Sequence, residues 1–476
     1  MLKEILLSQK DFYYGTYRIV NPGFYKLTED IVFHPNPENN FLPRSDQGDK
    51  YPKNNGYFLG FFSVLTIECN DVILDLNSFT IEYSIEFNLK QRFGSIIELG
   101  SSPFIPKQGP GNFGNTFSKA TNVNIKNGKL GRNPHHGIHG NDPEGLIISN
   151  LEISNFEVAG ISINGGKSMQ FSDIIIKNNS NINSLSAYSQ CKFSIEPLKH
   201  IVAINKNSQL ELNNRDVLGI DILKEVENEI INFENYVLNG GKYEGMFKND
   251  SKLYDGNIYG IVLNTRGVVI NEFKDKRTDD SIGNEAIFLK NIIIDRIISE
   301  GKESRVLAFD DNVSAYGKNV CKGFAGDVLD FNICCDENGL YNDNILSNVQ
   351  LLINKYGDDK TRGTCNIPDD IYKWISSNGS IDSFVENMPQ LYWVDGFDSM
   401  AHKMKGNIGL FISQGKNLYT ENILINSIIN EGKNSNTDSS QSIGIGLIGC
   451  EDLNLNDIVV TKIESKYGKK MDYYIK

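Results

Sequence analysis

The stretch from Asn150 to Ile176 reads NLEISNFEVAGISINGGKSMQFSDIII, and it contains the pattern that decides the fold. It begins with an Asn followed by alternating apolar residues and continues into a β-rich phrase that starts at Gly160. At Asp173, 23 residues after Asn150, the first phrase returns. A β pattern repeating at this period is typical of a solenoid of short strands, in which each repeat packs only on its neighbours.

The two phrases recur along most of the chain. Copies of the first begin at Asp71, Asn122, Asn150, Asp173, Asn291, Asn422 and Asp457, and copies of the second begin at Gly160, Gly260, Ala286, Gly409 and Gly446. Asn tolerates left-handed backbone angles and therefore suits the corners between strands. The phrase-final residues Asn127, Asn155, Asn178 and Asn264 are the corner candidates.

Breaks in this pattern divide the chain. We expect an N-terminal capping segment and loop over residues 1–62, a first part of the solenoid over 63–181, a helical insertion over 182–256, middle coils over 257–301, a second helical insertion over 302–405, final coils over 406–463 and a tail over 464–476. In the first insertion, helical spacing of apolar residues predicts a helix from Asp221 to Val237, stopped by Gly240. In the second, similar patterns predict helices over 343–356, 369–377 and 381–388.

Charge and composition narrow the class of protein. The chain has 47 basic and 60 acidic residues and a net charge of −13, which argues against nucleic acid as the main partner. No apolar run reaches the roughly 18–20 residues of a membrane span, and the N-terminal run is too short for a signal peptide. The seven cysteines form no CxxC pair, which favours reduced thiols. The expected location is a host cytoplasm, or the virion if the protein is viral.

Two stretches carry a resemblance to a known group. Asp71–Ile81 and Asn122–Leu130 resemble the first coils of right-handed parallel β-helix proteins of the pectate lyase-like superfamily, and the similarity covers most of residues 17–181, 257–300 and 406–463. The Asn-, Ile- and Lys-rich composition is similar to that of β-helix proteins encoded by large DNA viruses of protists. The resemblance implies an all-β, single-stranded right-handed parallel β-helix with two largely helical insertions.

The same resemblance implies extended glycans as the substrate or ligand class, because the group includes polysaccharide lyases, polygalacturonases, tailspikes and surface proteins without activity. The calcium-binding Asp pattern of pectate lyases has no match in this chain, and the paired aspartates lie outside the repeat strands. No family mechanism is therefore carried over. We expect no cofactor and no metal, with calcium kept as an open possibility.

Three stretches are candidates for chemistry. In the first, Asn133 to Glu144, three of the six histidines fall within five residues. If Ile138 faces the core, His139 faces outward with Asp142 at the next corner, and this pair could act as a general acid or base while His136 binds substrate. A metal there would need a ligand from a neighbouring coil. The alternative is that these histidines are turn and surface groups that stack on the next coil.

The second stretch lies where the second insertion re-enters the repeats. It places an aromatic platform, two carboxylates, an imidazole and a lysine close together in sequence: Tyr392, Trp393, Asp395, Asp398, His402 and Lys405. β-Elimination from an acidic sugar needs a base near the C5 proton and a cation on the carboxylate, and His402 and Lys405 could serve. The alternative is a helix end that packs on the repeats.

The third candidate is the pair Asp310 and Asp311, which could bind calcium or act as an acid/base couple. The alternative is an acidic helix start.

Three functions are compatible with these features. The favoured one is a structural or surface protein, virus-particle or glycan-associated, that binds extended carbohydrate or builds a surface layer. A homo-oligomer is compatible with this role. The others are a polysaccharide lyase or glycoside hydrolase acting on an acidic glycan, and a host-protein interaction module. The absence of a family catalytic signature favours the first and leaves enzymatic activity undecided.

Overall fold

The computed structural model describes residues 3–39, 41–52, 57, 60–89, 94–103, 117–178, 209–212, 215–244, 258–271, 274–299, 406–430 and 441–465. Most of them belong to two parallel β-sheets. The twelve-stranded sheet contains β1 (Glu4–Leu7), β3 (Gly23–Leu27), β4 (Ile31–Phe33), β6 (Val72–Asp75), β7 (Thr80–Tyr83), β9 (Thr121–Leu130), β11 (Glu144–Ser154), β13 (Lys167–Asn178), β19 (Asn284–Ser299), β21 (Gly415–Asn430), β23 (Glu451–Leu455) and β24 (Ile458–Ser465). The eight-stranded sheet contains β2 (Tyr17–Ile19), β5 (Ser63–Ile67), β8 (Ser95–Leu99), β10 (His136–Asn141), β12 (Ala159–Asn164), β16 (Ile258–Asn264), β20 (Gly406–Ser413) and β22 (Gln441–Ile448).

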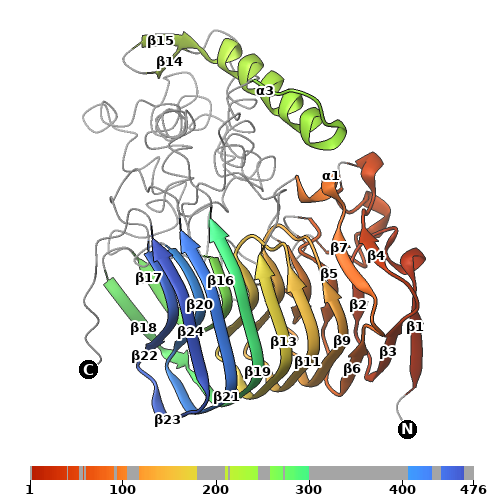
Figure 1. The fold of residues 1–476 in the computed structure, drawn as a ribbon. Coiled ribbons are helices and arrows are strands. Elements are labelled where there is room, and N and C mark those ends of the chain that lie inside the picture. The colour runs from red at the N-terminus through yellow and green to blue at the C-terminus, as the bar shows by residue number, and fades with distance from the viewer. Residues whose placement is uncertain are drawn as a thin grey trace.

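Successive repeats lie side by side in both sheets (Figure 1). In the eight-stranded sheet, Ile138 pairs with Ile97 on one side and with Ile161 on the other. In the twelve-stranded sheet, Leu151 pairs with Ile174, so the phrase that begins at Asn150 lies beside the phrase that begins at Asp173. The repeat seen in the sequence is therefore the unit of strand pairing, and each copy extends the stack by one strand per sheet.

The predicted fold class is corrected by this arrangement. We expected a single-stranded right-handed parallel β-helix with two largely helical insertions. The described strands instead form two separate multi-stranded parallel sheets, of twelve and eight strands, and the described helices are few. The apolar alternation specifies strands and their parallel neighbours, but it does not specify how whole sheets are arranged. The prediction of a β-helix therefore required more than the alternation could provide.

The described part of the first insertion is partly β, and the second insertion lies outside the described residues. In the first, β14 (Gln209–Leu212) and β15 (Arg215–Leu218) form an antiparallel hairpin before α3 (Gly219–Asn239). Helix α3 confirms the helix predicted from Asp221, and it ends at Gly240, whose φ of 72° is left-handed. A second antiparallel hairpin, formed by β17 (Arg266–Asn271) and β18 (Lys274–Ile282), lies outside the insertions, within the middle coils expected over residues 257–301. The three helices predicted between residues 343 and 388 lie outside the described residues.

Short helical segments complete the described chain near its N-terminus: η1 (Gln9–Phe12), η2 (Pro37–Asn39), η3 (Ser45–Gln47) and α1 (Ile85–Asn88). Phe12 in η1 is fully buried, as are the neighbouring aromatic side chains of Phe33 and Phe61. The N-terminal segment thus contributes buried aromatic side chains to the core beside the first strands.

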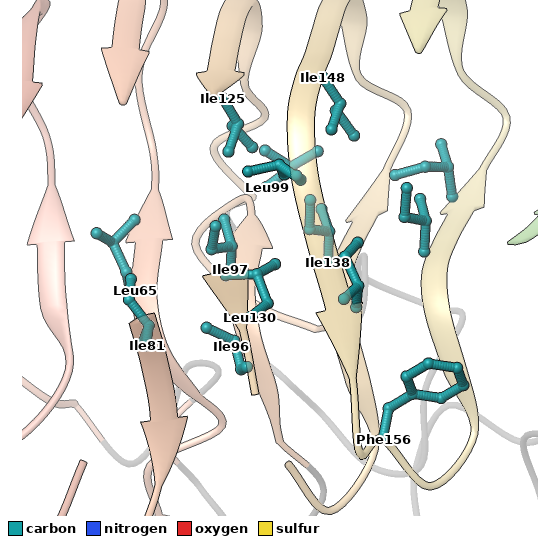
Figure 2. Close-up of a cluster of buried hydrophobic side chains, with 14 of the residues drawn as sticks. Leu65, Ile81, Ile96, Ile97, Leu99, Ile125, Leu130, Ile138, Ile148 and Phe156 are labelled. Carbon is teal, nitrogen blue, oxygen red and sulfur yellow. The ribbon is translucent and has the colours of Figure 1, made fainter. Parts of the chain in front are cut away.

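The core consists of aliphatic side chains that line up from strand to strand. Figure 2 shows Leu65, Ile97 and Ile138 on neighbouring strands, and the pairing registers place them in one row. These side chains are fully buried, as are Ile125 and Ile148 of the twelve-stranded sheet. Complete burial of one such side chain stabilises the fold by about 1.5–3 kcal/mol. Repetition of equivalent side chains therefore gives one continuous core instead of several small ones.

Left-handed corners separate the straight parts of the repeats. The residues that begin the first phrase, among them Asn122, Asn150 and Asp173, all have φ between 49° and 58°. Their side chains form ladders across repeats, as in the bond that Asn150 Nδ2 donates to Asn127 Oδ1 at 3.0 Å. Such bonds satisfy amide groups that would otherwise compete with the sheet ladders.

Of the four residues predicted to lie at corners, two do and two do not. Asn127 and Asn155 have positive φ, so these predictions are confirmed. Asn178 and Asn264 are not among the described residues with positive φ, so these predictions are wrong. Asn178 is instead a buried strand residue opposite Ile297, and its side-chain amide has no hydrogen-bond partner among the residues that the structure describes. Both residues occupy the final position of a phrase, where the sequence does not distinguish a corner from the last residue of a strand.

Candidate functional site

The histidine-rich stretch forms strand β10, and a glycine sets its shape. A methyl group at Gly137 would lie 2.6 Å from the carbonyl oxygen of Gly160 and 2.7 Å from Cγ2 of Ile153, so only glycine lets the strands approach this closely. Ile138 enters the core, whereas His136 and His139 lie together with their rings stacked 5.0 Å apart. The two imidazoles therefore share one surface of the strand, although both are almost completely buried.

His139 is held by a carboxylate from the preceding strand of the sheet. Glu98 in β8 is its register partner, and Nδ1 of His139 lies 2.8 Å from Oε1 and 2.9 Å from Oε2 of Glu98. Ser95 donates a further bond to Oε2 of Glu98 at 3.1 Å. Glu98 is fully buried, so this pairing satisfies a carboxylate that would be costly to bury alone.

The other imidazole nitrogen faces an amide. Nδ2 of Asn164 lies 3.3 Å from Nε2 of His139 and donates to Oδ1 of Asn141 at 2.8 Å. Asn141 in turn donates to the carbonyl oxygen of Pro103 at 2.9 Å. Because Nε2 meets an N–H donor, the proton is assigned to Nδ1, which then donates to Glu98. The network thus runs from Glu98 through His139 to Asn141, with both nitrogens of His139 occupied.

His135 and His136 complete the cluster as neutral groups. Their Nδ1 atoms lie 2.8 Å apart, a distance that requires one nitrogen to donate and the other to accept. Burial, and secondarily the nearby His139, lowers the pKa of His135 to about 3. Burial, followed by His135 and His139, holds the pKa of His136 well below its usual range. A positive charge on either ring is therefore disfavoured at neutral pH.

Asp142 lies at the corner after β10, with φ of 55°, but it faces cations and not the imidazoles. Its Oδ2 is 3.6 Å from Nζ of Lys119 and 3.8 Å from a guanidinium nitrogen of Arg266. The predicted His139–Asp142 pair is therefore replaced by a Glu98–His139 pair, while Asp142 belongs to a separate ion cluster that includes Lys119, Arg266 and Glu144. Both clusters thus bring together side chains from segments that are distant in the sequence.

Glu98 is the residue that the sequence did not single out. It occurs in the strand Ser95-Ile96-Ile97-Glu98-Leu99, whose residues are all buried. The available signal was an ionisable residue inside an apolar run, because a buried carboxylate needs a partner. The sequence alone could not identify that partner, since 41 residues separate Glu98 from His139.

The remaining predicted site residues cannot be placed. Those of the second and third candidates lie outside the described residues: Asp310, Asp311, Tyr392, Trp393, Asp395, Asp398, His402 and Lys405. Among the residues that are described, no three His, Cys, Asp or Glu side chains are arranged to hold a metal ion. The described helices include none with the length and apolar character of a membrane span.

A second surface of interest lies on the outer face of the twelve-stranded sheet. We name it the aromatic facet and define it as Gln170, Phe288, Lys290, Tyr419 and Glu421. Gln170, Phe288 and Tyr419 are register partners on adjacent strands, and the rings of Phe288 and Tyr419 stack 5.0 Å apart at 5°. Beside them, Nζ of Lys290 lies 2.8 Å from Oε1 of Glu421. All five side chains retain contact with solvent.

The side chains of the facet face away from the core because the neighbouring side chains along each strand face the core. Ile287 and Leu289, on either side of Phe288, are both buried in the core. The facet therefore combines an aromatic stack with adjacent donors and acceptors on a surface that repeats with the strand spacing, about 4.8 Å. Neither Phe288 nor Tyr419 was a candidate from sequence, because an aromatic residue in a strand phrase is equally compatible with the core.

Comparisons of the chain with protein-family models, with curated protein sequences and with solved structures give no match. The resemblance drawn from the first repeats accordingly stays a prediction, and the functional argument depends on the geometry above.

Proposed function

We propose that this protein is a non-catalytic, glycan-binding structural protein, and that the aromatic facet is its carbohydrate-binding surface. The observation that carries the proposal is the alignment of Gln170, Phe288 and Tyr419 on three adjacent strands. Aromatic rings offer apolar area to the C–H face of a sugar, and neighbouring amide, ammonium and carboxylate groups can bond its hydroxyls.

The burial and hydrogen bonding of the histidine cluster support a non-catalytic role for the protein. A general base must reach the proton that it removes, and His139 is almost completely buried with both ring nitrogens occupied by Glu98 and Asn164. His135 is half-buried and His136 is buried, and because the pKa of each is lowered, neither offers a cation for the carboxylate of an acidic sugar. The cluster is better explained as a polar contact that fixes the register of three adjacent strands.

The net charge of the chain favours one class of glycan ligand over another. At −13, the protein repels polyanions over the range of the Debye length, so a neutral glycan is favoured over an acidic one. A single facet offers only a small contact area, and affinity would increase if several copies presented it together. A surface layer or particle coat built from this chain would provide that multivalency.

The facet is tested by binding to neutral polysaccharides, measured by affinity electrophoresis or by co-sedimentation with an insoluble glycan. We expect the wild-type protein to bind, and we expect Tyr419→Ala and Phe288→Ala to weaken binding about tenfold, since each loss removes one stacking ring. Tyr13→Ala is the matched control, because Tyr13 is an exposed aromatic residue near the N-terminus that lies outside the facet. Equal binding by all three variants, or no binding by the wild-type protein, would remove the basis of the proposal.

A further inference from the structure

The aromatic facet belongs to a longer row of side chains on the same face of the twelve-stranded sheet. Register pairs continue from Gln170 and from Tyr419 in opposite directions, with one residue on each strand. The further members of the row are Phe24, Ile73, Asn124, Ile147 and Asn454. With Gln170, Phe288 and Tyr419 they form what we call the long row, which crosses β3, β6, β9, β11, β13, β19, β21 and β23 (Figure 1). Seven strand spacings of about 4.8 Å give the long row a length of about 34 Å.

The long row faces away from the core along its whole length. Leu146 and Ile148, on either side of Ile147, are buried, whereas Ile147 is 37% exposed. Tyr25 is likewise buried next to the half-exposed Phe24. The other members of the row all keep at least partial contact with solvent. The alternation that builds the core therefore leaves a continuous surface on the outside of the sheet.

Apolar and amide side chains are interleaved along the long row. Phe24 and Ile73 are followed by Asn124, and Ile147 is followed by Gln170, before the two rings of the facet. Apolar side chains can contact the C–H groups of a sugar, and an amide can bond its hydroxyls. A linear glycan presents both kinds of group repeatedly along its length, so its chemistry matches that of the row.

The charges beside the long row nearly cancel. The row two residues further along the strands holds Lys26, Asp75 and Lys126 on the first strands and Lys290 and Glu421 in the facet, with serines between them. Three lysines against two acidic residues leave a single positive charge, on a chain whose net charge is −13. A neutral chain rich in hydroxyls can bond to groups of both signs, whereas a polyanion would be repelled by the acidic remainder of the protein.

We propose that the long row binds one linear, neutral glycan chain, which lies across the strands and contacts the row with several successive sugar units. This inference rests on the proposed function, and it adds that the facet is one part of an extended site. The unbroken register from Phe24 to Asn454 carries it. An extended polypeptide fits less well, because it would bind at a sheet edge with free backbone groups, whereas the backbone beneath the long row is engaged in the sheet.

Titration calorimetry with β-linked and α-linked glucose oligomers, from disaccharide to decasaccharide, tests the length of the site. We expect the affinity to rise with chain length until the chain spans the long row. Phe24→Ala and Ile147→Ala should each weaken binding of the longest chains about threefold and leave the shortest unaffected, because short chains are held at the facet. Ile175→Ala is the matched control: Ile175 is 40% exposed on β13, but it lies beyond the left-handed corner at Asp173, outside the long row. Equal melting temperatures show that a weakened variant has lost a contact and not its fold.

Two results would overturn this inference and leave the proposed function intact. Affinity that stops rising at the trisaccharide, with Tyr419→Ala the only variant that weakens binding, would confine the site to the facet. Weakening by Ile175→Ala equal to that by Ile147→Ala would place the chain elsewhere on the sheet. Absence of binding at every length, or binding that Tyr419→Ala does not change, would instead remove the proposed function and this inference with it.

Discussion

At the scale of single residues, close approach of the strands decides what can be substituted. Gly137, Gly160 and Gly260 stand at equivalent positions, and a methyl group at each would lie within 2.8 Å of the next glycine's carbonyl oxygen or of a core isoleucine. None of these glycines has a positive φ, so their role is steric and not conformational. Glycine here is a packing requirement of the repeat.

Gly160→Ala should therefore destabilise the fold. The added methyl would lie 2.8 Å from both the Gly260 oxygen and Cγ2 of Ile176, and relief requires the strands to separate. We expect a loss of about 1–3 kcal/mol in the free energy of unfolding, as for overpacked cores. Gly48→Ala is the control, because its nearest neighbour, the Ser45 oxygen, is 3.7 Å away. Urea titration followed by circular dichroism compares the two, and equal midpoints would contradict the close approach.

The structural roles of single residues could be predicted only in part from the sequence. The Asn-rich pattern correctly indicated corners at Asn127 and Asn155, because a left-handed backbone favours Asn. It failed at Asn178, a buried strand residue opposite Ile297 whose amide finds no partner within the described part of the chain. It also gave His139 the wrong partner, since Asp142 is close in sequence whereas Glu98 comes from another strand. Local spacing cannot report a contact that depends on register between repeats.

At the scale of elements, strand β10 combines core packing with a titratable cluster. His135 and His136 have pKa values lowered by burial, whereas their pKa is about 6.5 in an unfolded chain. Below pH 6.5 the unfolded state therefore binds protons that the folded state does not. The stability contributed by the neutral pair is fully present above pH 6.5 and decreases as the pH falls towards the folded-state values.

We thus expect the melting temperature of the wild-type protein to fall as the pH is lowered from about 7 to about 5, a range in which His titrates. The double variant His135→Asn, His136→Gln has no such groups and should lose less on acidification, even if it is less stable at pH 7. His34→Gln serves as the control, because this half-exposed histidine lies outside the cluster. Scanning fluorimetry at several pH values gives the slopes; parallel slopes for wild type and double variant would refute the assignment.

At the scale of the whole molecule, the sequence predicted the unit but not the assembly. The repeated phrase identified which residues pair, as Leu151 with Ile174 and Ile292 with Ile423 show. It did not predict two sheets of twelve and eight strands, because each phrase records only its own alternation and nearest neighbours. The aromatic facet was likewise unpredicted, since it arises from where its strands lie in the stack.

The central claim is that the buried histidine cluster is structural and that binding occurs elsewhere, on the aromatic facet. One experiment tests both parts: binding, release of reducing ends and ultraviolet absorbance of unsaturated products are followed on neutral and acidic polysaccharides for wild type, His139→Gln and Tyr419→Ala. We expect binding without products in the wild-type protein, retained binding with a lower melting temperature in His139→Gln, and binding weakened about tenfold with an unchanged melting temperature in Tyr419→Ala. Product formation by the wild-type protein that disappears in folded His139→Gln would contradict the account and make His139 catalytic.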